Sequence, residues 1–131
     1  MTTRNLVGLV SVSHSLFPKM RATGVATGDA VDLQGYDSAS IVVAFGDYTN
    51  GSHLASVQHS DDDSNYSDCV FGVDIKGHSN FSAIATAPEA NSAQELYYVG
   101  NKRYLKVVMT TTGGTNGAVS SAFVIKGHPH H

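Results

Sequence analysis

The chain has 131 residues, which is enough for one domain around a single hydrophobic core. Its 8 Lys and Arg against 11 Asp and Glu give a formal net charge of -3, without the basic excess of a nucleic-acid-binding protein. Charged residues are only 15% of the chain, and 13 of the 131 residues are glycine. This composition favours a β-protein with little helix.

Cys69 is the single cysteine, so the chain has no internal disulfide framework and no cysteine-rich zinc site. The longest apolar run, residues 41–45, is far below the roughly 18 residues of a membrane-spanning helix. The apolar N-terminal stretch is interrupted by Gly8, Ser11 and Ser13, which is atypical of a secretory signal. We therefore expect synthesis and folding in a cytoplasm, with no membrane partner.

Strand patterns recur at short intervals in the first half of the chain, separated by Gly, Asn, Asp and Ser. The first strand is expected over residues 6–12, and residues 31–33 alternate in polarity. The apolar run 41–45 predicts a central strand covered on both faces. A turn with an Asn50-Gly51 step follows, so residues 53–60 are expected to return as the second strand of a hairpin.

The second half continues the pattern after a polar loop at residues 61–65. A weaker strand is expected over residues 69–75, and residues 76–94 indicate a loop. Residues 96–99 and 103–110 predict two further strands, and the second of them places Leu105, Val107 and Met109 on one face.

The last strand has Val119, Phe123 and Ile125 alternating with smaller residues, which predicts a hairpin with the preceding strand and a core face formed by the larger side chains, with small outward residues that could themselves be covered. The chain as a whole is expected to be all-β, a single-domain antiparallel β-sandwich or barrel-like domain over residues 25–131. An N-terminal segment, residues 1–24, precedes it as either a contact arm or the first sandwich strand.

Metal ligation is not favoured by the acidic and histidine residues. Asp61, Asp63 and Asn65 have the spacing that opens a calcium loop, but its sixth position is Tyr66 and its twelfth is Gly72, where Gly and Glu are needed. His53 and His59 share a strand face, but six residues of strand separate them by about 20 Å. Three further histidines gather in the tail, at His128, His130 and His131. We therefore expect no metal and no cofactor.

Catalytic motifs are incomplete in the same way. Gly77-His78-Ser79 resembles a nucleophile elbow, but Phe81 stands where that motif needs glycine. Cys69 has no activating context, and Glu89 and Glu95 are the only glutamates. We expect no catalytic residues and no enzyme activity.

One segment interleaves aromatic and basic residues, as a platform for single-stranded nucleic acid would. Alternation should place part of this set in the core, which argues against direct nucleic-acid binding. Its members are Tyr97, Tyr98, Lys102, Arg103, Tyr104 and Lys106.

Four stretches of the chain resemble a family of small proteins encoded in the structural gene clusters of tailed bacteriophages and related prophages. They are AVDLQGYDSASIVVAFG, the SDDDSNYSD loop, NKRYLKVVMTTTGG and the ending SAFVIKGHP, in order over residues 25–131. The resemblance implies a virion component. A chain this small and β-rich is most similar to a capsid decoration, or cement, protein that binds the outside of the major capsid lattice and stabilises it.

On this interpretation the partners are the major capsid protein and further copies of the chain, as a dimer or trimer on the lattice. The localisation is the capsid surface of the virion. The alternatives are a minor tail or head-to-tail connector protein, and a carbohydrate-binding β-sandwich on the virion surface. The expected contact residues are the apolar side chains of the N-terminal segment, namely Leu6, Val7, Leu9, Val10, Val12, Leu16 and Phe17.

Overall fold

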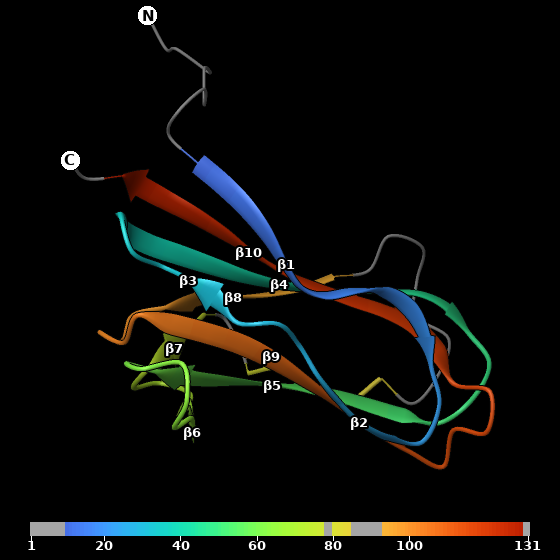
Figure 1. The fold of residues 1–131 in the computed structure, drawn as a ribbon. Coiled ribbons are helices and arrows are strands. Elements are labelled where there is room, and N and C mark those ends of the chain that lie inside the picture. The colour runs from blue at the N-terminus through green and yellow to red at the C-terminus, as the bar shows by residue number, and fades with distance from the viewer. Residues whose placement is uncertain (1–9, 78–79, 85–92, 130–131) are drawn as a thin grey trace, which may run out of the picture.

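A computed structural model of the protein describes residues 10–77, 80–84 and 93–129, and within them the fold is all-β (Figure 1). Two antiparallel sheets pack face to face as a single-domain β-sandwich, so the predicted fold class is confirmed. The strands are β1 (Val10–Arg21), β2 (Gly24–Thr27), β3 (Val31–Asp32), β4 (Tyr36–Tyr48), β5 (Ser52–Ser60), β6 (Ser67–Asp68), β7 (Ile75–Lys76), β8 (Ala93–Tyr98), β9 (Tyr104–Thr112) and β10 (Ala118–Pro129).

The two sheets are built from strands that are distant in sequence. Sheet A has the order β1-β10-β4-β8-β7, and sheet B has the order β2-β9-β5-β6 with β3 also paired to β9. From β4 onward the long strands alternate between the layers, because β4, β8 and β10 belong to sheet A while β5 and β9 belong to sheet B. The fold depends on non-local pairing throughout.

The core lies between the inner faces of the sheets. Ile41 and Leu96 contribute to it from sheet A, and Leu105, Val107 and Met109 from sheet B, all fully buried. The three β9 residues are those that alternation placed on one face, so that expectation is confirmed.

Both predicted hairpins are wrong. β4 and β5 are joined by a short turn, but β4 lies in sheet A and β5 in sheet B. β9 and β10 are also joined by a short turn, but β9 lies in sheet B and β10 in sheet A. The side-chain oxygen of Asn50 in the first crossover accepts the backbone N–H of Gly117 in the second at 2.9 Å, and Thr49 N–H donates to the Gly117 carbonyl at 2.8 Å. A turn signal indicates chain reversal only, and here each reversal carries the chain across the core.

The core face of β10 is the opposite of the one predicted. Ala118, Ser120, Ala122 and Val124 are fully buried, while Phe123 and its outward-facing neighbours are only half-buried. Small inward side chains on this central strand leave room for the larger residues of sheet B. The size of a residue therefore misidentified the buried face.

Other sequence-predicted elements need smaller corrections. β4 buries one face, because Val42 and Ala44 are only half-buried, so it is not covered on both sides. The weak strand expected over residues 69–75 is a turn between the two-residue strands β6 and β7. The first strand extends to Arg21, well beyond the predicted end, and pairs with β10 at the edge of sheet A.

Candidate functional site

Four of the seven expected contact residues are not found on the described surface. Leu6, Val7 and Leu9 lie outside the described residues. Leu16 is buried in the core with 4% of its surface exposed. Leu16 therefore anchors β1 to the domain and does not present itself to a partner in this conformation.

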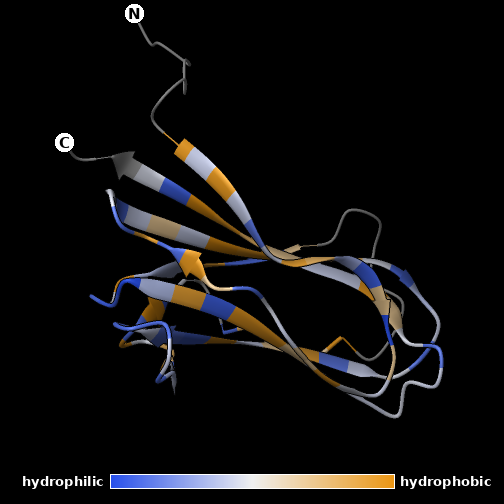
Figure 2. Cartoon of the chain, in the orientation of Figure 1, coloured by the Kyte–Doolittle hydropathy of each residue, from blue (hydrophilic) through white to orange (hydrophobic). Residues whose placement is uncertain are grey.

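The other three expected contact residues are exposed on β1. Val10, Val12 and Phe17 have 39%, 57% and 60% of their surface accessible. Val10 and Val12 alternate with half-buried serines along the first part of the strand, an alternation visible in Figure 2. An edge strand thus displays apolar side chains to solvent on one face.

These residues belong to a larger apolar surface, the outer face of sheet A, formed by side chains that point away from sheet B. The strand register places Val12 beside Ile125, which continues to Ser40 and Tyr97, in one row across four strands. Exposed apolar residues of this face are Val10, Val12, Phe17, Met20 and Tyr97, and half-buried ones are Val42, Ala44, Val119, Phe123 and Ile125.

An aromatic cluster fixes Phe17 to this face. The His14 ring stacks on the Phe17 ring with centroids 5.2 Å apart, and it meets the edge of Phe123 at 6.1 Å. The strand is irregular after His14, where its register with β10 shifts. The ring contacts keep Phe17 on the outer face despite that irregularity.

The carboxylate of Glu95 on this face is hydrogen-bonded to side chains of the same sheet. Glu95 on β8 accepts the Ser40 hydroxyl at 2.7 Å and the Tyr97 hydroxyl at 3.1 Å. The bond to Glu95 is the main cause that raises the pKa of Tyr97. A partner that covers this face would contact an apolar surface on which Glu95 already accepts hydrogen bonds from Ser40 and Tyr97.

The outer face of sheet B is more polar. Val25 and Leu54 are exposed there, at 66% and 43%, in register across Thr110. Elsewhere the face carries paired polar positions such as Lys106 beside Gln58. The two faces of the sandwich therefore differ in character, and the continuous apolar one belongs to sheet A.

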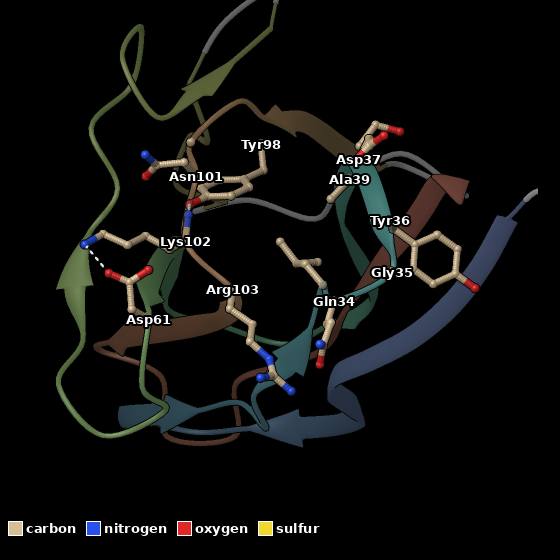
Figure 3. Close-up of a pocket in the computed structure, with 13 residues that line it drawn as sticks. Gln34, Gly35, Tyr36, Asp37, Ala39, Asp61, Tyr98, Asn101, Lys102 and Arg103 are labelled. Atoms are coloured by element: carbon tan, nitrogen blue, oxygen red, sulfur yellow. Dashed lines mark hydrogen bonds and ion pairs between the residues drawn. The ribbon is translucent and has the colours of Figure 1, made fainter. Parts of the chain in front are cut away.

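A polar cleft of about 430 Å³ opens at one end of the sandwich between the loops before β4 and after β8 (Figure 3). Its two cations are paired: Lys102 contacts Asp61 at 3.0 Å, and Arg103 makes a two-pronged ion pair with Asp32 at 2.9 and 2.8 Å. These contacts hold the pKa of Asp32 at about 2, and the Arg103 hydrogen bond is the main cause. Lys102 and Arg103 at the cleft are therefore each paired with a carboxylate of the same domain.

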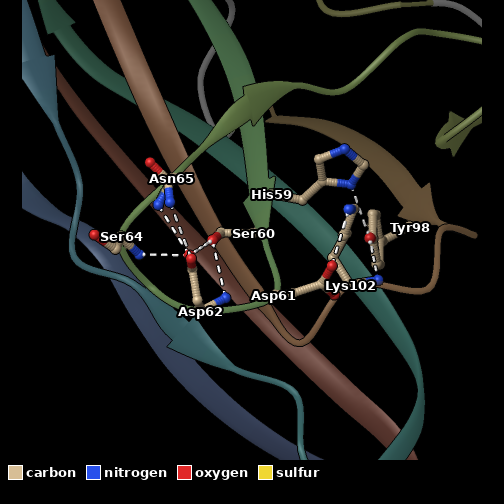
Figure 4. Close-up of polar contacts among 8 residues, drawn as sticks. All are labelled: His59, Ser60, Asp61, Asp62, Ser64, Asn65, Tyr98 and Lys102. Atoms are coloured by element: carbon tan, nitrogen blue, oxygen red, sulfur yellow. Dashed lines mark hydrogen bonds and ion pairs between the residues drawn. The ribbon is translucent and has the colours of Figure 1, made fainter.

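The acidic loop after β5 is organised by its own carboxylate (Figure 4). Asp62 accepts the backbone N–H groups of Ser64 and Asn65 at 3.0 and 2.9 Å and the Ser60 hydroxyl at 2.8 Å. These bonds hold the pKa of Asp62 well below its usual range. The carboxylate thus acts as a turn-forming acceptor.

The two strand histidines are core residues with separate partners. His53 is fully buried, with Nδ1 3.0 Å from the Thr111 hydroxyl and Nε2 3.0 Å from the Asn50 carbonyl. His59 is buried beside Tyr98. His130 and His131 lie outside the described residues. Across residues 10–77, 80–84 and 93–129, no group of three or more His, Cys, Asp or Glu side chains is placed to hold a metal ion.

The interleaved aromatic and basic segment is divided between environments. Tyr97 is on the outer face of sheet A, whereas Tyr98 is buried. The Arg103 guanidinium lies 5.0 Å from the Tyr104 ring centre, and the Lys106 ammonium lies 3.8 Å from the ring centre of Tyr66. These residues form no continuous stacking platform.

No family model, curated protein or solved structure matches this chain. Among the described residues, none belongs to a helix that could cross a membrane.

Sequence reasoning missed much of the outer face of sheet A. Phe123 and Ile125 were assigned to the core, while Met20 and Tyr97 were not singled out as contact residues. The alternation along β10 separates two faces but does not say which one meets the second sheet. The signal for this surface is therefore present in sequence, but its direction is decided by the packing.

Proposed function

We propose that the protein is a structural virion protein that decorates the outer surface of a tailed-phage capsid and stabilises the capsid lattice. The observation that carries this proposal is the exposed apolar outer face of sheet A, whose most exposed apolar side chains are Val12, Phe17 and Tyr97. Exposed, contiguous apolar surfaces of this kind mark sites of protein association. The resemblance of residues 25–131 to phage structural proteins supports the same role.

Attachment in this proposal is non-catalytic and uses the major capsid protein as the partner. Each copy needs only modest affinity, because many copies engage a repeating lattice and bridging contacts add to one another. Burial of apolar area provides the driving force. Binding should therefore weaken only mildly with added salt, since the chain has a net charge of -3 and no large electrostatic surface to screen.

The test measures binding of purified protein to capsids stripped of it. Phe17→Ser and Tyr97→Ser should each weaken binding about tenfold, which corresponds to about 1.4 kcal/mol of lost apolar contact. Val25→Ser is the control, because Val25 is also an exposed apolar residue, at 66%, but lies on sheet B. Equal binding by all three variants, each with parental thermal stability, would remove the outer face of sheet A as the attachment surface.

Placement in the virion separates decoration from its alternatives. Antibody labelling or a particle reconstruction should find copies spread over the whole capsid, and stripped particles should release DNA at a lower temperature than decorated ones. Copies confined to one vertex or to tails would favour the connector.

A further inference from the structure

The outermost strands of the sandwich are unequal. β7, β6 and β3 have two residues each and β2 has four, whereas β1 has twelve. Short edge strands offer few backbone groups to another chain, which limits edge-to-edge association. β1 is therefore the outermost strand with the longest backbone edge for strand pairing.

Only the first part of that edge is regular. Residues 10–14 pair with β10 without interruption, and register shifts follow between His14 and Leu16 and between Leu16 and Lys19. At Ser15 the strand is already covered, because its carbonyl accepts the Asp29 N–H at 2.7 Å and its hydroxyl donates to the Asp29 carbonyl at 2.9 Å. Pro18 then lacks a backbone donor. The described edge that can accept another strand is thus residues 10–14.

This stretch is complementary to itself. If two copies run antiparallel with Val12 opposite Val12, then Ser11 lies opposite Ser13 and Val10 lies opposite His14. Valine pairs and serine pairs are favourable cross-strand neighbours, and no like charges meet. Val12 is the midpoint of residues 10–14, so this register pairs all five of these described residues with one another, whereas a shift toward the C-terminus would oppose part of the stretch to the irregular region after His14.

We propose that two copies of this chain associate through residues 10–14 of β1, antiparallel, with the two-fold axis at Val12. The dimer joins two copies of sheet A into one continuous sheet. Residues directly opposite in an antiparallel pair project to the same side, so the outer faces of both copies lie on one side of the dimer. The row of Val12, Ile125, Ser40 and Tyr97 then continues into the second copy, with Val12 beside Val12 at the junction. If the protein decorates a capsid, the dimer attaches at two points. The dimer itself does not depend on the proposed function, whereas this role in attachment does.

Cysteine cross-linking tests the register directly, in a Cys69→Ser background and with the full chain. Val12→Cys should form a disulfide-linked dimer under mild oxidation, because opposite residues in an antiparallel pair have Cα atoms about 4.5 to 5.5 Å apart, within disulfide range. Val10→Cys alone should not, since the two copies of residue 10 would be about 13 Å apart. Mixing Val10→Cys with His14→Cys should restore the cross-link, as a mixed dimer.

Charge variants at the same position test association without a covalent bond. Val12→Lys and Val12→Glu should each sediment as monomers, because like charges meet on the axis, and an equal mixture should sediment as a dimer. Val25→Lys, on the edge strand of sheet B, should remain dimeric like the parent. Sedimentation across a concentration series provides the measurement.

A parent chain that stays monomeric at every concentration would overturn the proposal, and so would a Val10→Cys protein that cross-links with itself. Neither result would bear on capsid attachment by the outer face of sheet A, which the stripped-particle experiment measures separately. Failure of the dimer and failure of the decoration function are therefore distinguishable.

Discussion

The Tyr98 hydroxyl lies 2.9 Å from Nδ1 of His59 in the interior of the sandwich, and this contact joins β8 of sheet A to β5 of sheet B. The same hydroxyl accepts the backbone N–H of Lys102 at 2.9 Å, so it satisfies the turn that leads into β9 as well. The two rings meet edge to face, with centroids 5.7 Å apart. One hydroxyl therefore links the layers and fixes a loop.

Tyr98→Phe should lower the free energy of unfolding by about 1 to 3 kcal/mol, because it leaves a buried histidine nitrogen and a backbone N–H without a partner. Tyr97→Phe is the control, since Tyr97 is 51% exposed and its hydroxyl donates only to Glu95. That variant should stay within about 0.5 kcal/mol of the parent. Urea denaturation of both variants checks the difference, and equal losses would contradict the role given to the buried hydroxyl.

Gly117→Ala should prevent stable folding. Gly117 has a positive φ of 79°, and an added Cβ would overlap the carbonyl oxygen of Arg21. Gly113 also has a positive φ, 64°, but faces open space. Gly113→Ala should therefore cost only the conformational penalty of about 1 to 2 kcal/mol. Thermal melts of the two variants separate the steric effect from the backbone effect, and similar melting temperatures would show that the loops can separate at low cost.

Val124→Ala should destabilise the protein more than Ile125→Ala, although isoleucine loses more carbon atoms. Val124 is fully buried between the sheets, so its truncation should cost about 2 to 3 kcal/mol. Ile125 is only half-buried on the outer face of sheet A, so its truncation should cost about 1 kcal/mol. The order in chemical denaturation decides which face of β10 is the core.

Asp32→Asn should remove a contribution to stability that is complete above about pH 4 and absent near pH 2. The Arg103 ion pair lowers the pKa of the Asp32 carboxyl from its usual 3.8 to about 2. The unfolded chain therefore takes up the proton first, so the contribution is present above pH 3.8 and is lost as the pH falls to 2. Both side chains are more than 40% exposed, which keeps the effect below about 1 kcal/mol.

Melting temperatures of the parent and the Asp32→Asn variant from pH 2 to pH 7 measure this difference. The two curves should converge near pH 2 and separate by pH 5. A gap that is constant over the whole range would assign the loss to a cause other than the ionised carboxylate.

Cys69 should react slowly with thiol reagents in the folded protein. Burial, with smaller contributions from the charges of Asp74 and Asp68, raises the pKa of its thiol to about 12. Little thiolate is then present at pH 8, and the thiolate is the reactive form. Labelling with a chromogenic disulfide at pH 8 should be slow in buffer and fast in urea. Fast labelling in buffer would mean that this turn opens readily.

Local sequence patterns were enough to predict the β class, the approximate position of most long strands and the inward alternation of Leu105, Val107 and Met109. These features depend on residues close to one another in the chain, since alternation and turn residues act locally. The same local signals also separated the two faces of β10.

The sheet that each strand joins and the face that it turns inward depend on packing between the two sheets. The residues around Asn50 predict a hairpin turn. The Asn50 side chain instead accepts a hydrogen bond from Gly117, in the connection between β9 and β10. Val124 is buried and Ile125 is not, because small residues on β10 match the large ones across the core. The sheet assignment at Asn50 and the buried face of β10 both depend on the shape and pairing of distant strands. The outer face of sheet A and the free edge of β1 are therefore defined only when both sheets are assembled.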